Sequence, residues 1–397
     1  MNRRSVQGMK QGDDVGENIA KYRNLAGLTQ EQLARRAGVS RSMLSKVEKG
    51  HASASTTWIG AIASALAIDA SRLYGTAEDY ADLADVLPVL RRSLAATDLM
   101  DPDLEPRPIQ DLRFQSAQVA EWRKNTKYRK IIGALPDLVD QLLISGNDVG
   151  APAYTLLTDA YRAANTVAHK LGYTDLSLTA TERMEWAATR SGDPLLLATV
   201  AYVKAATLAR VGATKQALRL IEKTLGDIEP LVDEDATAGA VFTILHMRAG
   251  TIAAATGQAD ASRSHLREAA QMAPHIGGDR IIYDTPVGPT NLALYQLCAE
   301  VDLGEPGRAM EIARSTRMPK GFPKERQAYF WIDTARAHLL AGDVDEAINA
   351  LCESRMASSE HFRSSSAVKS VIKTAAKQQR RASGSLRSLA NAAGIAD

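Results

Sequence analysis

The sequence predicts an all-α protein, in which a small N-terminal helical bundle precedes an α-solenoid built from pairs of helices. Short, capped and basic helical patterns occupy the first 75 residues. From about residue 109 onward, helix follows helix with almost no strand-like alternation, and small residues recur at the same place in each pair. With 397 residues the chain is too long for one small bundle, so a second, larger core is required.

Residues 28–50, LTQEQLARRAGVSRSMLSKVEKG, predict two short helices joined by a tight turn. Thr29 is a favourable N-cap and Gln32 completes a capping box, while Gly38 supplies the backbone freedom that the turn needs. Ser40 then caps the second helix. Between residues 20 and 50, seven Lys or Arg stand against two Glu, and this excess of five positive charges is typical of phosphate binding.

This stretch resembles the helix-turn-helix of the Cro and lambda-repressor (Xre) family of bacterial regulators, and the resemblance extends from about Val15 to Tyr74. It implies binding to double-stranded DNA, with the third helix of the domain in the major groove. It also implies a buried salt bridge between Arg23 and Glu48, and Trp58 is expected in the core. The residues expected at DNA are Gln30 and Ser40 beside the phosphate backbone, and Arg41, Ser42, Ser45 and Lys46 at or near the base edges.

The helical region carries an internal period that is similar to the tetratricopeptide repeat. Aligning the units on their turns gives Asp175, Gly212, Gly257, Gly304 and Gly342. Five residues after these turns stand Ala180, Ala217, Ser262, Ala309 and Ala347, which would let the two helices of a unit approach closely. The spacings of 37, 45, 47 and 38 residues exceed the repeat's usual length of about 34, so long loops are expected, among them 278–289.

The expected boundaries are a flexible arm over 1–12, the DNA-binding domain over 13–75, a linker helix with a proline-containing loop over 76–108, the solenoid over 109–362 and basic capping helices over 363–397. A less regular pair of helices, at about Ile109 to Leu143, opens the solenoid. In the C-terminal segment Val368, Val371, Ile372 and Ala375 share one helical face, and basic residues share the other. This pattern predicts a cap with a polar outer face, and an auxiliary DNA or dimer contact is the alternative.

The whole chain resembles actinobacterial regulators that join an Xre-type helix-turn-helix to a tetratricopeptide-like sensor, and more loosely the peptide-sensing quorum regulators. The resemblance implies a ligand in the concave face, which the first helix of each pair lines. Counting from the turns places there Arg162, Asn165, His169, Tyr202, Arg210, Met247, Arg248, Thr251, Asn291, Tyr295, Tyr329, Asp333 and Arg336. Amides, aromatic rings and arginines suit an extended peptide. The alternative is that these residues only pack between neighbouring units.

Patterns typical of enzymes and metal sites are missing from the sequence. Seven histidines are scattered, and there is no HExxH, GxSxG or GxxxxGK[ST] motif. Cys298 and Cys352 lie in apolar helical patterns, so we expect reduced core residues rather than ligands or a disulfide. Neither a signal peptide nor a membrane span is expected. We therefore expect a cytoplasmic protein without catalytic residues, cofactor or metal.

Together these patterns predict a sequence-specific, DNA-binding transcriptional regulator that acts on an operator as a homodimer. Its repeat domain is expected to sense a peptide, a small molecule or a partner protein, or to dimerise. The alternative is a non-enzymatic interaction adaptor that the helix-turn-helix tethers to DNA.

Overall fold

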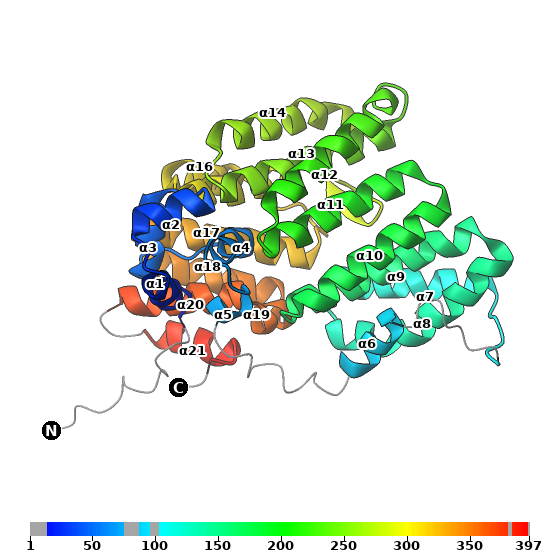
Figure 1. The fold of residues 1–397 in the computed structure, drawn as a ribbon, viewed down its shortest axis with the longest axis horizontal. Helices are drawn as coiled ribbons and strands as arrows, with labels where there is room; N and C mark the ends of the chain where they lie inside the picture. Colours follow the sequence, from blue (N-terminus) through cyan, green and yellow to red (C-terminus); the bar gives the residue numbers. More distant parts are fainter. Residues whose placement is uncertain (1–13, 75–86, 96–102, 380–382, 396–397) are drawn as a thin grey trace.

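The computed structural model describes residues 14–74, 87–95, 103–379 and 383–395, so the arm expected over 1–12 and parts of the expected linker lie outside the described residues. The described chain is almost entirely helical, and a small bundle packs against a large layer of paired helices (Figure 1). The expected all-α class, with a helix-turn-helix bundle before an α-solenoid, is confirmed.

Five helices form the N-terminal bundle, and their local signals are those that the sequence predicts. They are α1 (Val15–Leu25), α2 (Gln30–Ala37), α3 (Arg41–Glu48), α4 (Thr56–Ala65) and α5 (Ser71–Tyr74). Thr29 and Gln32 form a reciprocal capping box, and Gly38 ends α2 in the left-handed conformation at φ 68°. Ile19, Leu33 and Trp58 are buried in the core of the bundle, which confirms the expected place of the tryptophan.

The solenoid consists of successive antiparallel helix pairs. It opens with α7 (Ile109–Lys124) and α8 (Tyr128–Val149). The pairs that follow are α9 (Ala151–Lys170) with α10 (Thr174–Ser191), α11 (Pro194–Arg210) with α12 (Thr214–Ile228), α13 (Ala236–Ala255) with α14 (Ala259–Ile276), α15 (Pro289–Leu303) with α16 (Pro306–Ser315), and α17 (Lys324–Ala341) with α18 (Val344–Ala357). A short 3-10 helix, η2 (Glu229–Leu231), follows α12.

The turn of the first pair differs from the prediction. Asp175 lies inside the first turn of α10, and the turn residue is Gly172, which has a φ of 79°. The other four turn glycines also have positive φ, as predicted for a tight turn. The alignment erred by three residues, which is close to one helical turn. A shift of this size keeps the same face of α10, so the position predicted for close packing still holds a small buried residue, Ala180.

Small residues stand where the two helices of a pair nearly touch. A Cβ atom added to Gly250 of α13 would lie 2.7 Å from Leu266 Cγ on α14. Ala217, Ser262, Ala309 and Ala347, at the predicted close-packing positions of the second helices, are fully buried. The predicted spacing of small residues is therefore the packing contact that joins each pair.

Two segments outside the pairs also belong to the solenoid. The linker helix α6 (Leu87–Ala95) packs against α8 and α10, and buries Leu90 and Leu94 in their core. The expected loop at 278–289 instead contains an antiparallel hairpin of β1 (Arg280–Ile282) and β2 (Thr285–Val287). Its two turn residues, Tyr283 and Asp284, both have positive φ, as a two-residue hairpin requires. Strands of three residues are too short to give a detectable alternation.

Three helices end the described chain: α19 (Ser359–Ser364), α20 (Ser366–Gln378) and α21 (Gly384–Ala392). The apolar face predicted for α20 is buried against α17, α18 and α21, so this helix covers the last pair of the solenoid. In the middle of the repeat array, α13 is the one described helix that is long and apolar enough to cross a membrane. Because 83% of that apolar window is buried in the fold, it is a core helix.

Candidate nucleic-acid interface and central cavity

The outward face of α3 is the surface from which DNA contacts are expected. Met43, Leu44 and Val47 anchor the helix in the core, and the Ser40 side chain accepts a hydrogen bond from the Met43 backbone N–H at 3.0 Å. Outward-facing residues of α3 and the following turn line a shallow concave surface, and they are Arg41, Ser42, Ser45, Lys46, Lys49 and His51. Helix α3 lies at one edge of the molecule (Figure 1).

A buried ion pair fixes α3 against α1. Arg23 donates to both carboxylate oxygens of Glu48, at 2.7 and 3.0 Å, so the predicted salt bridge is confirmed. Gln30 Nε2 also donates to Glu48, at 2.7 Å, which engages the amide that was expected at phosphate. Arg41, by contrast, is exposed and lies 3.7 Å from the equally exposed Glu31, a contact that contributes little in water.

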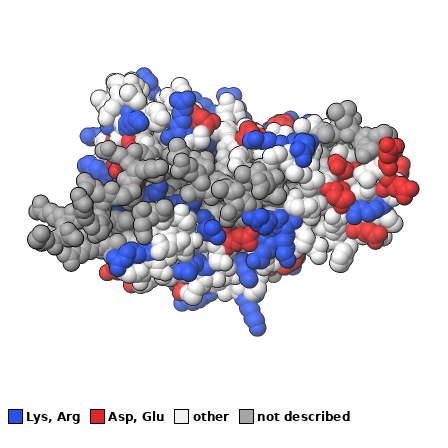
Figure 2. Space-filling view, turned by 90° about the horizontal axis from the view of Figure 1, so that it is seen from below, with Lys and Arg blue, Asp and Glu red and all other residues white. Residues whose placement is uncertain are grey.

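The charge on the molecular surface is unevenly distributed. Viewed from below, acidic side chains gather at the end of the molecule opposite the N-terminal bundle, while Lys and Arg side chains are spread over the rest of that face (Figure 2).

The first helices of the pairs surround a central cavity of about 290 Å³. Residues of α9, α11, α13, α15 and α17 line it, together with the β1–β2 hairpin and the beginning of α20. The remaining wall comes from the N-terminal bundle, whose residues 54–57 include the first turn of α4. The cavity in the concave face of the solenoid is therefore shared with the N-terminal bundle.

The hairpin is held against the cavity by charged groups. Arg123 of α7 forms a salt bridge with Asp284 at 2.5 Å, and Lys124 contacts the same carboxylate at 3.2 Å. These cations hold the pKa of Asp284 below its usual value, although burial alone would raise it. The guanidinium of Arg162 donates to the Tyr283 carbonyl and to the Thr285 hydroxyl, both at 2.5 Å.

Neutral histidines and a buried ion pair also line the cavity. Lys170 contacts Glu325 at 2.8 Å, and it also donates to the Tyr329 hydroxyl. Burial, together with the charges of Arg210 and Lys170, holds the pKa of His169 well below its usual value. Burial and Lys170 lower that of His361 to about 3. Both histidines are therefore uncharged at neutral pH, and the charge of the cavity comes from its arginines, lysines and carboxylates.

Comparison with known proteins bears on the N-terminal bundle. Residues 19–73 match the family described as helix-turn-helix. These residues are a helix-turn-helix domain. Such domains bind double-stranded DNA, so the protein is a DNA-binding transcriptional regulator. No curated protein matches the chain.

A solved structure, described as Bacillus thuringiensis PlcR in complex with the peptide PapR7 and DNA, resembles the chain at 17% sequence identity. The likeness covers 66% of this chain and 95% of that one, with a TM-score of 0.27. The peptide and the DNA named in that description are ligands of PlcR.

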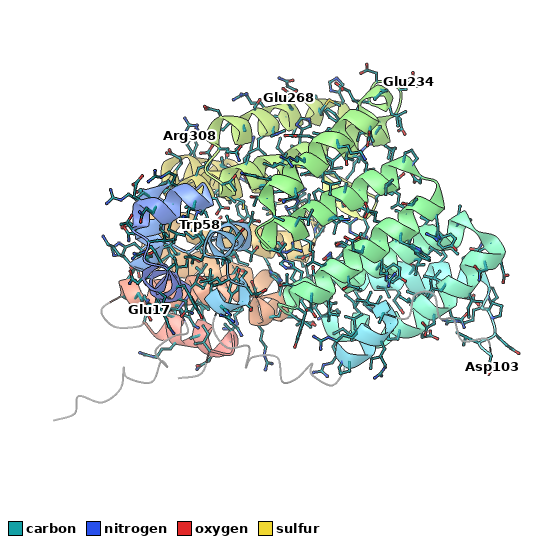
Figure 3. All side chains as sticks on the ribbon, in the orientation of Figure 1. Glu17, Trp58, Asp103, Glu234, Glu268 and Arg308 are labelled. Atoms are coloured by element: carbon teal, nitrogen blue, oxygen red, sulfur yellow. The ribbon has the colours of Figure 1, made fainter. Side chains whose placement is uncertain are left out.

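The helix-turn-helix domain contacts the solenoid backbone to backbone. A Cβ atom on Gly60, in the middle of α4, would lie 2.4 Å from the Arg210 carbonyl oxygen of α11. At a second point, a Cβ on Gly257 would lie 2.7 Å from the Gly38 carbonyl oxygen, in the turn between α2 and α3. Trp58 of α4 lies beside this interface with 1% of its surface exposed (Figure 3). The domain is docked, and only residues without side chains fit at these two points.

Polar side chains connect the same two parts of the molecule. Arg336 of α17 forms salt bridges with Asp302 at 2.5 Å and with Asp333 at 2.7 Å, and its Nε donates to the Ser53 carbonyl at 3.3 Å. The Ser55 hydroxyl donates to Asp302 at 2.5 Å. On the other side of the domain, Lys377 of α20 contacts Asp14 and Glu17 of the helix-turn-helix domain. Helix α20 thus contacts the DNA-binding domain and also covers the last pair of the solenoid.

Most of the residues that the sequence places in the concave face do line one cavity. These are Arg162, Asn165, His169, Tyr202, Arg210, Arg248, Thr251, Asn291, Tyr295, Tyr329, Asp333 and Arg336. Met247 is an error, because its side chain is fully buried in the core between α13 and its neighbours, one residue away from the face that Arg248 occupies. Asp333 and Arg336 are engaged with each other and, through Ser53, with the DNA-binding domain.

Sequence reasoning missed several contributors to the cavity, among them Arg326, the β1–β2 hairpin and the wall formed by residues 54–57. Arg326 was outside the positions counted, and the hairpin was expected to be a loop. The wall formed by residues 54–57 depends on contacts across more than two hundred residues of chain, so no local pattern encodes it. A glycine in the interior of an otherwise regular helix, Gly60, was the one available signal, because such a glycine commonly marks a close backbone approach.

Both cysteines are free and half-buried, and Cys298 lines the cavity.

Proposed function

We propose that this regulator binds a two-fold symmetric operator as a homodimer, with α3 of each copy in the major groove. The support is local: α3 is capped, fixed by the Arg23–Glu48 pair and basic on its outward face. One recognition helix covers too few base pairs for useful specificity, which favours two copies on one operator.

The side chains proposed to contact base edges are Arg41, Ser42, Ser45 and Lys46, and those proposed at the phosphate backbone are Gln30 and Ser40. Arg41 can leave its weak contact with Glu31 and donate to guanine O6 and N7 together. Gln30 would have to exchange its bond with Glu48 for a phosphate oxygen. That exchange leaves the Arg23–Glu48 pair to fix the geometry of α3.

We further propose that the central cavity binds the signal that controls DNA binding. The observation that carries this proposal is the wall that the DNA-binding domain itself contributes, at residues 54–57. A molecule held there contacts the solenoid and the DNA-binding domain at once. A ligand that makes such contacts shifts the balance between arrangements of the two domains by its difference in affinity for them. The proposal assigns no catalytic step to the chain.

The test of DNA recognition is footprinting on the gene's own upstream region, followed by titration with the wild type and Arg41→Ala. We expect Arg41→Ala to lose about 1–3 kcal/mol of binding free energy and to relax specificity at one base position. Arg308→Ala is the matched control, because this exposed arginine points outward from α16, away from α3 (Figure 3). A footprint without sequence preference, unchanged by Arg41→Ala, would favour the tethered adaptor instead.

A further inference from the structure

The positive charges of the central cavity outnumber its carboxylates. Eight cations line it, and they are Arg123, Lys124, Arg162, Lys170, Arg210, Arg248, Arg326 and Arg336. Only four carboxylates do so, and they are Asp284, Asp302, Glu325 and Asp333. Each carboxylate is already within ion-pair distance of Arg123, Lys124, Lys170 or Arg336. Half of the cations are therefore left without a carboxylate partner in the described part of the chain.

Three of these four arginines come from different helices of the solenoid. Arg210 ends α11, Arg248 lies on α13 and Arg326 lies on α17, and each is half-buried. The fourth, Arg162, is committed to the hairpin through its bonds to Tyr283 and Thr285. The three remaining arginines line one cavity, where a bound ligand can contact them.

Their existing partners are neutral. Arg210 Nη2 donates to the Thr207 hydroxyl at 2.8 Å, and Arg248 Nη2 donates to the Tyr295 hydroxyl at 3.0 Å. Arg326 Nε donates to the Asn291 amide oxygen at 2.9 Å. The Nε of Arg248 is buried without a hydrogen-bond partner. A guanidinium has five N–H donors, so each of the three retains donors for a ligand.

Burial disfavours the charge of Arg210 in the absence of an anion. Burial and the neighbouring charge of Arg248 lower the pKa of Arg210 to about 10. Aromatic faces relieve part of the cost, because the Arg248 guanidinium lies 4.4 Å from the centre of the Tyr202 ring and Arg326 lies 5.2 Å from that of Tyr295. They do not replace the carboxylate or phosphate oxygens that buried arginines prefer.

We propose that the central cavity binds a small organic oxyanion, whose carboxylate or phosphate group is held by Arg210, Arg248 and Arg326. The inference rests on the proposed function, and it names the chemical class of the signal. The volume of about 290 Å³ lies just below the range of small-molecule sites, about 300–1,000 Å³, which favours a small ligand over an extended peptide. Val203, Ala206, Leu294 and Ile332 line the same chamber, so the anion carries an apolar part.

The experiment follows the full-length protein by calorimetric titration and thermal unfolding with benzoate and with phenyl phosphate. Neutral benzamide and phenol are the matched controls, at equal ionic strength. We expect at least one oxyanion to bind saturably and to raise the melting temperature, and the neutral molecules to do neither. Absence of saturable binding of both oxyanions at millimolar concentration overturns the proposal. Binding only of short peptides with a free C-terminal carboxylate overturns the small-molecule class.

Variants separate this site from general effects of charge. Arg248→Met and Arg210→Met are expected to weaken oxyanion binding about tenfold or more, because each removes a charge-assisted hydrogen bond. Arg210→Met is expected to melt no lower than the wild type without anion, since burial and the charge of Arg248 already disfavour the charge of Arg210. Arg219→Met, on the exposed side of α12, is the control and should change neither property. Unchanged anion affinity in Arg248→Met and Arg210→Met overturns the assignment.

A parallel measurement keeps the two proposals distinguishable. Operator affinity is titrated with and without the oxyanion that binds best. If that oxyanion binds through the arginines but leaves operator affinity unchanged, the site stands and the cavity's role as a sensor fails. If no oxyanion binds while the footprint is specific, the DNA-binding proposal stands and the oxyanion site fails.

Discussion

Gly60→Ala tests whether the DNA-binding domain is docked on the solenoid as tightly as its backbone contacts require. The added methyl would lie 2.4 Å from the Arg210 carbonyl oxygen and 2.7 Å from that of Ala209. Ordinary contacts begin at 3.4 Å, so α4 and α11 would have to separate by 3.4 − 2.4 = 1.0 Å. Both obstacles are backbone atoms of a packed helix, which cannot rotate aside. We expect overpacking to cost about 1–3 kcal/mol.

The sign of the effect distinguishes docking from ordinary helix energetics. In an isolated helix, Ala in place of Gly is stabilising by about 1 kcal/mol. Gly133→Ala in α8 is the matched control, because its φ is ordinary and its new Cβ would meet nothing within 4 Å. Gly133→Ala should therefore raise the free energy of unfolding, while Gly60→Ala lowers it.

Amide hydrogen exchange identifies which helices the substitution destabilises. In Gly60→Ala, faster exchange is expected at the end of α11 and in α4, with unchanged rates in α7 and α8. Tryptophan fluorescence should also change, since Trp58 is buried beside the altered contact. If Gly60→Ala melts like Gly133→Ala and exchange in α4 and α11 matches the wild type, the docked arrangement is wrong.

Two further substitutions test the solenoid. Gly250→Leu should lower the free energy of unfolding, measured in denaturant titrations, by about 1–3 kcal/mol, because even its Cβ would lie 2.7 Å from Leu266 Cγ. A variant as stable as the wild type would refute the close contact between α13 and α14. Burial alone would raise the pKa of Glu325, but Lys170 lowers it from 4.5 to about 2, so this pair stabilises the fold above pH 4.5 and loses its contribution as the pH falls towards 2. Glu325→Gln should therefore be less stable than the wild type by roughly 3 kcal/mol at neutral pH, with the difference shrinking below pH 4.5, whereas a pH-independent difference would refute the ion pair's role.

The features that the sequence predicts well depend on contacts between near neighbours in the chain. The capping box of Thr29 and Gln32 spans three residues, and the tight turn needs only Gly38. The close contacts within a helix pair follow from the periodic small residues, of which Gly250 is the clearest. Even the error at Asp175 has a local cause, since a shift of about one helical turn keeps the same face of the helix.

No such local pattern predicts the walls that residues 54–57 and the β1–β2 hairpin add to the cavity. Arg336 bonds to the carbonyl of Ser53, far earlier in the chain, and the hairpin is held by Arg123 from α7. In a regular repeat array the concave face is an open groove, so counting positions identifies lining residues but not what closes the groove. Counting repeat positions also assumes that every lining residue is free to bind a ligand, whereas Arg336 already forms salt bridges with Asp302 and Asp333.

The short path from the cavity to α3 determines how a bound oxyanion would act on DNA binding. Helix α3 ends at Glu48, and only residues 49–53 separate it from the segment 54–57 that lines the cavity. That path is held at both ends, because Gln378 of α20 donates to the Gly50 carbonyl and Arg336 donates to that of Ser53. A ligand that moves 54–57 must therefore move α3 or break these bonds. By linkage, operator DNA must change the affinity for that ligand by the same factor by which the ligand changes the affinity for DNA.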